Sequence, residues 1–298
     1  MNRFELTVLG CSSATAAHGR HPSAQFLSIN THHFLIDCGE GTQFQLSKTK
    51  LKTSKISHIF ISHMHGDHYF GLVGLLSTFD LNGREKPLTI CGPAPLEQII
   101  KLQLWKLRYP LHFIALDFKD QMILEFGDLK VSTISLSHRI PCNGFIFEEI
   151  NRKKSLNKTE ISKHPLQPQH FKDLQIGKDI LVDGKLLSNE SLTIPLNPPK
   201  KYCYISDTRA LEKVSQMCFN ATLLYHEATF AESEMKRAEI TGHSTSVQAA
   251  EVAKKANAQA LLLGHFSAKY SHVDFLGTEA MKIFPNTSVA QELAKIIF

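Results

Sequence analysis

The sequence lacks an apolar run of about 18 residues, the length that a transmembrane helix needs. The first residues, Met1–Leu6, lead directly into an alternating pattern of apolar and polar residues and not into the apolar segment of a signal peptide. We therefore expect a soluble, cytoplasmic protein with no membrane partner.

Paired cysteines are also absent, because no Cys-x-x-Cys motif occurs. The cysteines stand singly, mostly inside apolar segments, which is typical of reduced core residues. Their spacing alone does not exclude a disulfide bond. They are Cys11, Cys38, Cys91, Cys142, Cys203 and Cys218.

Acidic and basic residues are nearly balanced, with 33 Lys+Arg against 28 Asp+Glu in 298 residues. The whole excess lies between Asn151 and Lys201, which hold ten basic and five acidic residues. A basic segment of this kind suggests a polyanionic partner, and a solvated loop is the alternative reading. With 43% hydrophobic residues, the 298-residue chain can bury a large core, either as one large domain or as a domain with an insertion.

The residues with the clearest chemistry form a short loop after the apolar run Ile59–Ile61. His63, His65, Asp67 and His68 lie within six residues there. Alternate side chains of an extended segment point the same way, so the first two can reach one ion and the last two a neighbouring point. Imidazole and carboxylate are ligands of zinc and manganese. This loop predicts a site for two metal ions.

Other predicted strands end in an acid or a histidine, namely at Asp37, His138, Asp207 and His265. A layered α/β fold gathers strand ends along one edge, so these residues can meet the histidine loop. Strands are expected over 4–9, 24–29, 33–36, 88–91, 131–137, 144–148, 201–207, 222–225 and 260–264. Helices are expected over 43–50, 71–79, 96–107 (with Trp105 in the core) and 246–256, which Thr245 and Gln248 start with a capping box, and two helices are expected at the C-terminus.

The histidine loop and the strand ends resemble the metallo-β-lactamase superfamily of metal-dependent hydrolases. Within it, residues 34–43, 206–209, His226–Thr229 and His243–Thr245 are similar to the motifs of the ribonuclease Z family. This resemblance implies an α/β fold, an αββα sandwich with a protruding arm. Residues 1–150 and 201–298 would form the catalytic domain, and residues 151–200 the inserted arm.

The resemblance also implies a ligand set for two Zn²⁺ ions, with Mn²⁺ as an alternative. His63, His65 and His138 would hold one ion, Asp67, His68 and His265 the other, and Asp207 would bridge them. Asp37 would orient these ligands by hydrogen bonds. A bridging carboxylate reduces the repulsion between two ions about 3.5–4 Å apart, and a hydroxide between them would attack the phosphate.

For catalysis, the resemblance implies an endonuclease that removes the 3′ trailer from precursor tRNA and leaves a 3′ hydroxyl on the tRNA and a 5′ phosphate on the trailer. Asp67 would orient the attacking water. Glu227 would orient His243, and His243 would stabilise the phosphate or protonate the leaving oxygen.

In that family the arm holds tRNA far from the metals, and the protein is a homodimer in which one subunit's arm serves the other's active site. Arm lysines would neutralise phosphates, which predicts salt-sensitive, shape-based binding. The candidates are Lys153, Lys154, Lys158 and Lys163. The arm lacks the family's usual Gly-Pro motif and has residues 166–170 instead, and residues 10–12 replace the frequent Gly-Thr-Gly.

Two other functions remain open at this stage. One is a hydrolase of the same superfamily that acts on small phosphodiesters or other esters, because fold and metal site do not fix the substrate. The other is a non-catalytic RNA-binding protein, which an intact ligand set disfavours.

Overall fold

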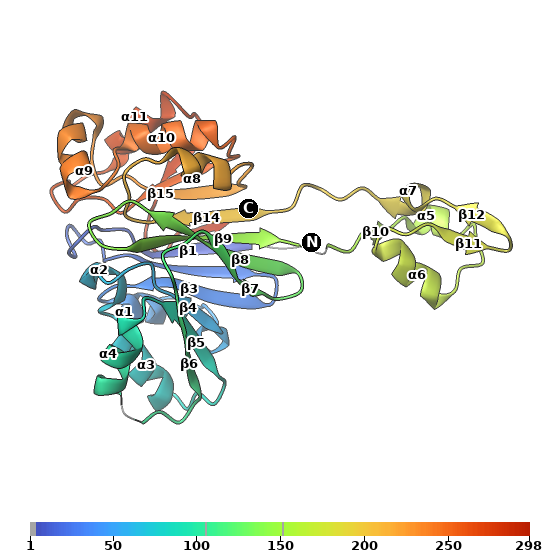
Figure 1. The fold of residues 1–298 in the computed structure, drawn as a ribbon, viewed down its shortest axis with the longest axis horizontal. Helices are drawn as coiled ribbons and strands as arrows, with labels where there is room; N and C mark the ends of the chain where they lie inside the picture. Colours follow the sequence, from blue (N-terminus) through green and yellow to red (C-terminus); the bar gives the residue numbers. More distant parts are fainter. Residues whose placement is uncertain (1–3, 105, 151) are drawn as a thin grey trace.

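The computed structural model describes residues 4–104, 106–150 and 152–298. Two seven-stranded sheets pack face to face, and helices cover the outer face of each (Figure 1). The fold is the predicted αββα sandwich with a protruding arm. Within the described residues, no helix is long and apolar enough to cross a membrane.

The first sheet is mixed, in the order β18-β1-β2-β3-β4-β5-β6. Antiparallel pairing joins β1, β2 and β3, and parallel pairing joins β3 to β6. Its strands are β1 (Phe4–Gly10), β2 (Ala24–Ile29), β3 (His32–Cys38), β4 (His58–Phe60), β5 (Leu88–Gly92), β6 (Leu111–Ala115) and β18 (Lys295–Ile297). Its outer face carries α1 (Thr42–Ser47), the 3-10 turn η1 (Thr53–Lys55), α2 (Gly66–Tyr69), α3 (Leu72–Leu81) and α4 (Pro95–Gln103).

The second sheet has the order β17-β16-β15-β14-β9-β8-β7. Its strands are β7 (Gln121–Glu125), β8 (Leu129–Leu136), β9 (Cys142–Glu149), β14 (Lys201–Ile205), β15 (Leu223–Glu227), β16 (Leu261–Gly264) and β17 (Thr287–Val289). Its helices are α8 (Glu212–Met217), the turn η2 (Glu232–Glu234), α9 (Met235–Thr241), α10 (Ser246–Lys255) and α11 (Asp274–Met281).

The main core lies between the two sheets and contains large fully buried side chains from both, such as Phe34, Phe60, Phe147 and Tyr204. A second core, with Leu35, Leu72 and Leu76, lies between the first sheet and its helices. All six cysteines are buried and free, as predicted.

The helix predicted over 246–256 is α10, and the predicted capping box is present, with Thr245 and Gln248 each bonded to the other's backbone. The helix predicted over 96–107 ends at Gln103, and Trp105 lies outside the described residues. The prediction of two C-terminal helices is wrong. The chain has one, α11, and then β17 and β18, because these short segments pair with β16 and β1 at the edges of the sheets.

The arm leaves the body after β9 and returns at β14, which are antiparallel neighbours in the second sheet (Figure 1). It has its own small core of Leu174, Ile180, Val182, Leu187 and Leu192. Its elements are β10 (Ser155–Leu156), α5 (Lys158–Ile161), α6 (Pro168–Gln175), β11 (Ile180–Val182), β12 (Lys185–Leu187), α7 (Asn189–Leu192) and β13 (Thr193–Ile194). The arm is therefore a folded lobe, whereas the sequence predicted only a polar insertion.

Candidate metal centre

The strand ends converge as the topology requires. The parallel strands β14, β15 and β16 end at Ile205, Glu227 and Gly264, so Asp207, Glu227 and His265 follow each other along one edge. Because β8 is two antiparallel pairings away from β14, it runs in the same direction and delivers His138 to the same edge. In the first sheet, β3 and β4 are parallel and deliver Asp37 and the histidine loop.

Three overlapping groups of side chains have the geometry of metal sites, with ligand atoms within 4.8 Å of one another in each. His63, His65, His138 and Asp207 form the first, and Asp67, His68 and His265 the second. The third, Asp207, His243 and His265, shares two members with these. In the first, Nδ1 of His65 lies 3.0 Å from Nε2 of His63 and 3.1 Å from Nε2 of His138. Two nitrogens that are each about 2.1 Å from a tetrahedral zinc lie about 3.4 Å apart, so this spacing fits a shared ion.

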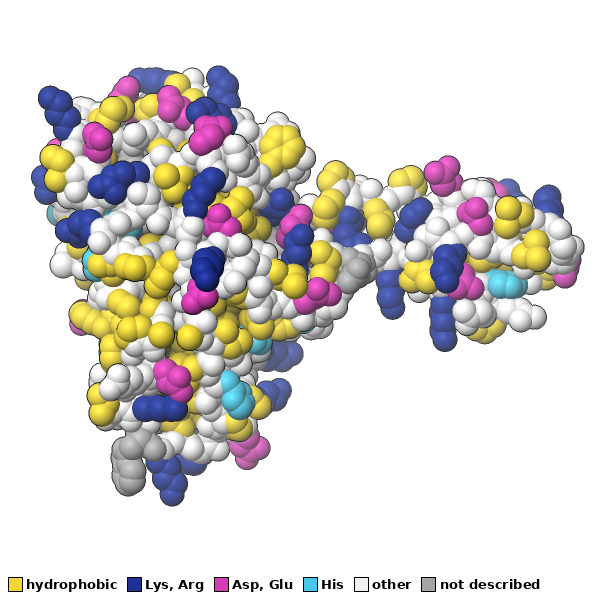
Figure 2. Space-filling model, in the orientation of Figure 1, with side chains coloured by type: hydrophobic (Ala, Val, Ile, Leu, Met, Phe, Trp, Pro, Cys, Tyr) yellow, Lys and Arg dark blue, Asp and Glu magenta, His cyan; other side chains and the backbone are white. Residues whose placement is uncertain are grey.

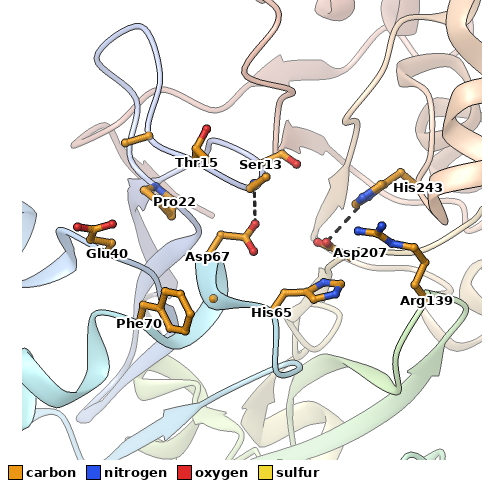
Figure 3. A pocket seen from close by; sticks show the side chains of 13 residues that line it. Ser13, Thr15, Pro22, Glu40, His65, Asp67, Phe70, Arg139, Asp207 and His243 are labelled. Atoms are coloured by element: carbon orange, nitrogen blue, oxygen red, sulfur yellow. Dashed lines mark hydrogen bonds and ion pairs between the residues drawn. The ribbon is translucent and has the colours of Figure 1, made fainter.

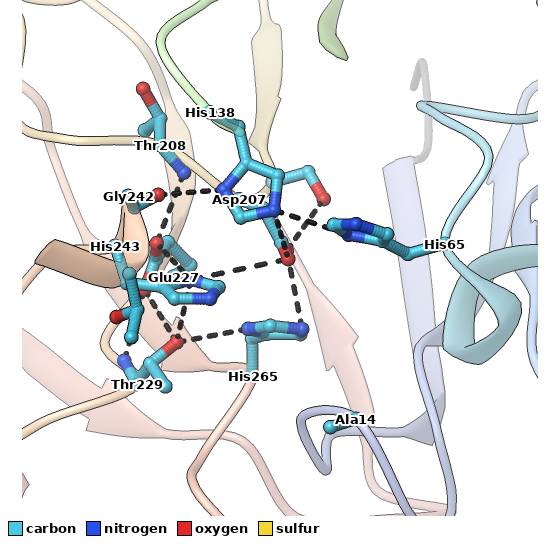
Figure 4. Close-up of polar contacts among 12 residues, drawn as sticks. Ala14, His65, His138, Asp207, Thr208, Glu227, Thr229, Gly242, His243 and His265 are labelled. Carbon is cyan, nitrogen blue, oxygen red and sulfur yellow. Dashed lines mark hydrogen bonds and ion pairs between the residues drawn. The ribbon is translucent and has the colours of Figure 1, made fainter. Parts of the chain in front are cut away.

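Asp207 faces the first and the second group. Its Oδ2 lies 3.7 Å from Nε2 of His63 and of His138, and its Oδ1 lies 3.1 Å from Nε2 of His265 and 3.4 Å from Nε2 of His68. Asp67 Oδ2 lies 3.4 Å from the same nitrogens of His68 and His265. Asp207 thus faces each group with a different oxygen, and Figure 4 shows its carboxylate between His138 and His265.

The imidazoles are held in position through their other ring nitrogens. Nδ1 of His68 lies 2.7 Å from Asp37 Oδ2, Nδ1 of His138 lies 2.7 Å from the carbonyl of Gly242, and Nδ1 of His265 lies 3.0 Å from Thr229 Oγ1. Gly242 ends α9 with a φ of 77°, a conformation that favours glycine and turns this carbonyl toward His138.

Asp37 is completely buried, and its carboxylate makes several of the hydrogen bonds that hold the histidines in position. Its Oδ1 accepts from the Ser62 amide at 2.8 Å, and its Oδ2 accepts from Ser62 Oγ at 2.9 Å and from the Tyr204 hydroxyl at 2.6 Å. It thereby fixes His68 and, through Ser62, the start of the histidine loop. Tyr204 and Ser62 were not singled out from the sequence, although Ser62 adjoins the loop.

The protonation states of the clustered histidines and aspartates favour the binding of a cation. Burial, followed by the neighbouring imidazole of His68, holds the pKa of His63 well below its usual value, and burial lowers the pKa of His138 to about 4. Both are neutral at pH 7 and have a lone pair to donate. Although burial opposes ionisation of Asp207, the nearby His265 and His68 hold its pKa well below the usual range. For His68, burial disfavours charge but Asp67 and Asp207 raise its pKa, so the carboxylates favour positive charge at this point. These residues therefore fit a divalent metal.

Glu227 and His243 lie beside the metal ligands. Nδ1 of His243 is 2.9 Å from Glu227 Oε1, which also accepts from the amides of Thr208 and Ser244 at 3.0 Å. The other oxygen accepts from Thr229. Burial lowers the pKa of His243, but the Glu227 carboxylate outweighs it and raises that pKa to about 9. The sequence placed these two residues as a pair, and the structure brings them into contact.

An open pocket of about 440 Å³ leads to this cluster (Figure 3). Its lining includes predicted residues, His65, Asp67, Asp207 and His243, and several that the sequence reading missed. The missed residues are Arg139, Phe70, Glu40, Pro22, Gly66 and the loop from Ser13 to Ala16. Arg139 directly follows His138, and this position could have identified it as a residue of the site. The amide of Ala14 donates to Asp67 Oδ2 at 2.7 Å, so this loop also orients a ligand.

Comparison with known proteins shows the family and the fold of the chain. The family model described as "Anti-Pycsar protein Apyc1" matches residues 4–273. Ribonuclease Z of Bacteroides fragilis (strain YCH46) is 41% identical over 98% of each chain, and that of Cytophaga hutchinsonii is 44% identical over 97% of this chain and 94% of the relative. The crystal structure of human tRNase Z, short form (ELAC1), superposes with a TM-score of 0.71, 27% identity and 98% coverage of both chains. The Bacillus subtilis metallo-β-lactamase fold protein YhfI superposes with a TM-score of 0.72 over both whole chains, at 21% identity.

The fold and the histidine–aspartate cluster thus define a metallo-β-lactamase-fold hydrolase. The chain belongs to the ribonuclease Z family, and the Apyc1 family model matches most of the same chain, including the arm.

Proposed function

We propose that this chain is the endoribonuclease that cleaves precursor tRNA after the discriminator nucleotide, leaving a 3′ hydroxyl on the tRNA and a 5′ phosphate on the trailer. The observation that carries this proposal is the Glu227–His243 pair beside the metal ligands, in a chain about 40% identical to ribonuclease Z over nearly its whole length.

The metal ligands are proposed as His63, His65 and His138 for one Zn²⁺, and Asp67, His68 and His265 for a second, with Asp207 shared. Mn²⁺ is the alternative ion. When bound, such ions lower the pKa of a water ligand and neutralise charge on a phosphoryl oxygen. This assignment is supported by Asp207, whose Oδ2 lies near Nε2 of His63 and whose Oδ1 lies near Nε2 of His265.

The protein's own groups supply positioning and proton transfer. Asp67, held by the amide of Ala14, can accept a hydrogen bond from the attacking water and orient it. His243, protonated at neutral pH beside Glu227, can donate a proton to the departing 3′ oxygen. Arg139 is exposed at the pocket rim and offers a guanidinium to a phosphate of the RNA.

The arm is the proposed contact to the body of the tRNA. Figure 2 shows Lys and Arg side chains distributed along it. Of the four candidate lysines, Lys154 donates to Asn189 Oδ1 at 2.7 Å and Lys163 pairs with Glu160 at 2.8 Å, so both stabilise the arm itself. Lys153 and Lys158 are exposed and are better placed to meet phosphates.

We propose a cytoplasmic homodimer. The direction of the arm supports binding of tRNA across its two subunits. The arm joins β14 at Lys201, whereas Asp207 follows the opposite end of that strand, and Figure 1 shows the arm extending away from α2 of the metal site. The two points are separated by roughly 15–20 Å of extended chain. A tRNA held by this arm is therefore better placed for the active site of a second subunit.

The direct test is incubation of the metal-loaded protein with a precursor tRNA that carries a 3′ trailer, followed by mapping of both product ends. We expect one cut after the discriminator. A protein that hydrolyses bis-p-nitrophenyl phosphate but leaves the precursor intact would instead be a hydrolase of small phosphodiesters.

Replacing Glu227 by glutamine is expected to lower kcat for trailer removal by roughly a hundredfold, the usual scale of a lost proton donor. Removal of the carboxylate charge lowers the pKa of His243 from about 9, so the alkaline limb of the kcat–pH profile should move to lower pH. Bound metal should remain, because Glu227 is not among the proposed ligands. Exposed Glu239, replaced in the same way, is the control. An unmoved alkaline limb would contradict the proposed pair.

A further inference from the structure

A second cavity, which we call the lysine groove, lies at the other end of the first sheet. It has a volume of about 510 Å³ and is formed by β1, β2, β3, β18 and the loop between α1 and β4. Its lining consists of Glu5, Thr7, Phe26, Ser28, Asn30, Thr31, His33, Lys50, Leu51, Lys52, Lys55 and Lys295. None of these residues belongs to the metal centre.

Strand β3 shows how the two sites are separated. His33, at its beginning, lines the groove, and Asp37, near its end, bonds to His68 of the metal centre. Four residues of extended strand span roughly 13 Å. A ligand in the lysine groove therefore leaves the metal pocket free.

The groove is strongly basic. Lys50, Lys52 and Lys55 are exposed, and within the described part of the chain none of them forms an ion pair. Lys295 is paired with Glu5 at 2.5 Å, and Glu5 is the one acid among the described lining residues. Three uncompensated positive charges around one cavity favour an anionic ligand and raise its local concentration.

Uncharged side chains make up much of the remaining lining. Leu51 provides apolar surface next to the buried Phe26, and Ser28 and Thr31 provide hydroxyl groups. Ser28 Oγ lies 2.8 Å from Nδ1 of His33, whose other nitrogen remains for a ligand. Burial and the charges of Lys55 and Lys52 lower the pKa of His33, so this imidazole is neutral and can accept or donate a hydrogen bond. The cavity thus combines anion-binding lysines with apolar and hydrogen-bonding surface.

We propose that the lysine groove is a nucleotide-binding site separate from the metal centre. Its lysines bind the phosphate, and its uncharged lining receives the sugar and base. The same chemistry is offered by one nucleotide of an RNA strand and by a free nucleotide. The site does not require that the protein cleave tRNA trailers.

The test uses metal-loaded protein and two probes. One is a fluorescein-labelled oligouridylate with 2′-O-methyl groups, followed by anisotropy, and the other is 5′-UMP, followed by calorimetry. In the groove variant, Lys50, Lys52 and Lys55 are all replaced by glutamine. Its affinity for the oligonucleotide should fall about tenfold or more, and the slope of log K against log salt should fall by roughly 2, since each phosphate contact on a single strand contributes about 0.7.

The control variant carries glutamine at Lys86, Lys254 and Lys282, exposed residues outside both cavities, and changes the net charge equally. It should bind both probes nearly as the wild type does. Replacing Glu5 by glutamine frees Lys295 and should tighten binding two- to threefold. Hydrolysis of bis-p-nitrophenyl phosphate should be unchanged in every variant, which shows that the fold and the metal centre are intact.

The outcomes separate the sources of the nucleotide. Weaker binding of both probes in the groove variant identifies a site open to free nucleotides. Weaker binding of the oligonucleotide alone identifies a site for an RNA strand. If the groove variant binds both probes as the control variant does, the proposal is wrong, and this result leaves trailer cleavage at the metal centre untouched.

Discussion

Alanine in place of His65 or Asp207 is expected to abolish removal of the tRNA trailer, with a loss of about a thousandfold or more. His65 lies within 3.1 Å of two other imidazole nitrogens, and Asp207 faces both ligand groups with separate oxygens. A bound metal contributes several kcal/mol of transition-state stabilisation, and each 1.36 kcal/mol corresponds to about tenfold in rate. Activity should be measured on the precursor tRNA and on bis-p-nitrophenyl phosphate, and both should be lost together.

Metal content and stability provide readouts that do not depend on activity. Elemental analysis of the purified variants should find less bound metal than in the wild type. A ligand that binds only the folded state raises its stability, so a chelator should lower the melting temperature of the wild type. The Asp207 variant should respond much less. Exposed His272, replaced by alanine, is the control and should retain metal, activity and the chelator response.

Full activity of either variant in protein with normal metal content would reject the proposed ligand set. The Asp207→Asn variant distinguishes the effect of the carboxylate charge from the effect of side-chain size. It keeps the size of the side chain but removes the negative charge that opposes repulsion between two cations. We expect it to resemble Asp207→Ala in activity, with a smaller effect on the stability of the metal-free protein.

The convergence of the candidate ligands could be predicted from the sequence because most of their positions follow a physical rule. Strands that run in the same direction end at the same edge of a sheet, so an acid or histidine directly after each strand is brought to one place. His138, Asp207 and His265 follow their strands within two residues, and Asp37 is the second-to-last residue of β3. The residues that the sequence reading missed hold the ligands from less regular positions. Ala14 acts through its amide, Gly242 through its carbonyl and Tyr204 from within a strand, so their side-chain identities gave no signal.

The arm illustrates why other structure escaped prediction. Its strands are two or three residues long and its core has five buried side chains, too few to produce a sustained apolar period. One local signal was present. Asp183 and Gly184 have φ values of 49° and 77° between β11 and β12, as in the type I′ turn that Asp-Gly favours. The C-terminal strands β17 and β18 had no such signal, since partners distant in sequence define them.

Replacing residues 151–199 by a short Gly-Ser linker is expected to leave hydrolysis of bis-p-nitrophenyl phosphate nearly unchanged and to weaken processing of precursor tRNA about a hundredfold or more. The linker can close because Glu148 and Lys201 are opposite each other in the antiparallel pair of β9 and β14, and the amide of Glu149 donates to the carbonyl of Lys200. The arm's small core is separate from the two cores of the body, so the catalytic domain keeps its packing.

The size of the effect follows from the lost phosphate contacts. Two charge-assisted hydrogen bonds, at about 1.5 kcal/mol each, correspond to roughly a hundredfold in affinity. The loss should appear in KM for the tRNA, and activity of the variant should depend less on salt than that of the wild type, because fewer counterions are released on binding. Glutamine at both Lys153 and Lys158 should reproduce part of the loss with the arm still folded.

A mixing experiment tests the proposed homodimer and the role of the arm in it. A protein without the arm but with an intact metal centre, combined with a full-length Asp207→Ala protein, can form dimers in which one chain supplies the arm and the other the catalytic residues. Because the arm points away from the metal centre of its own chain, such dimers should regain trailer removal that neither variant has alone. If the mixture cleaves the precursor, the arm of one chain must act together with the active site of the other chain. Equal loss on the small substrate and on tRNA after arm replacement would instead show that the arm supports the catalytic body and is not a separate site for RNA.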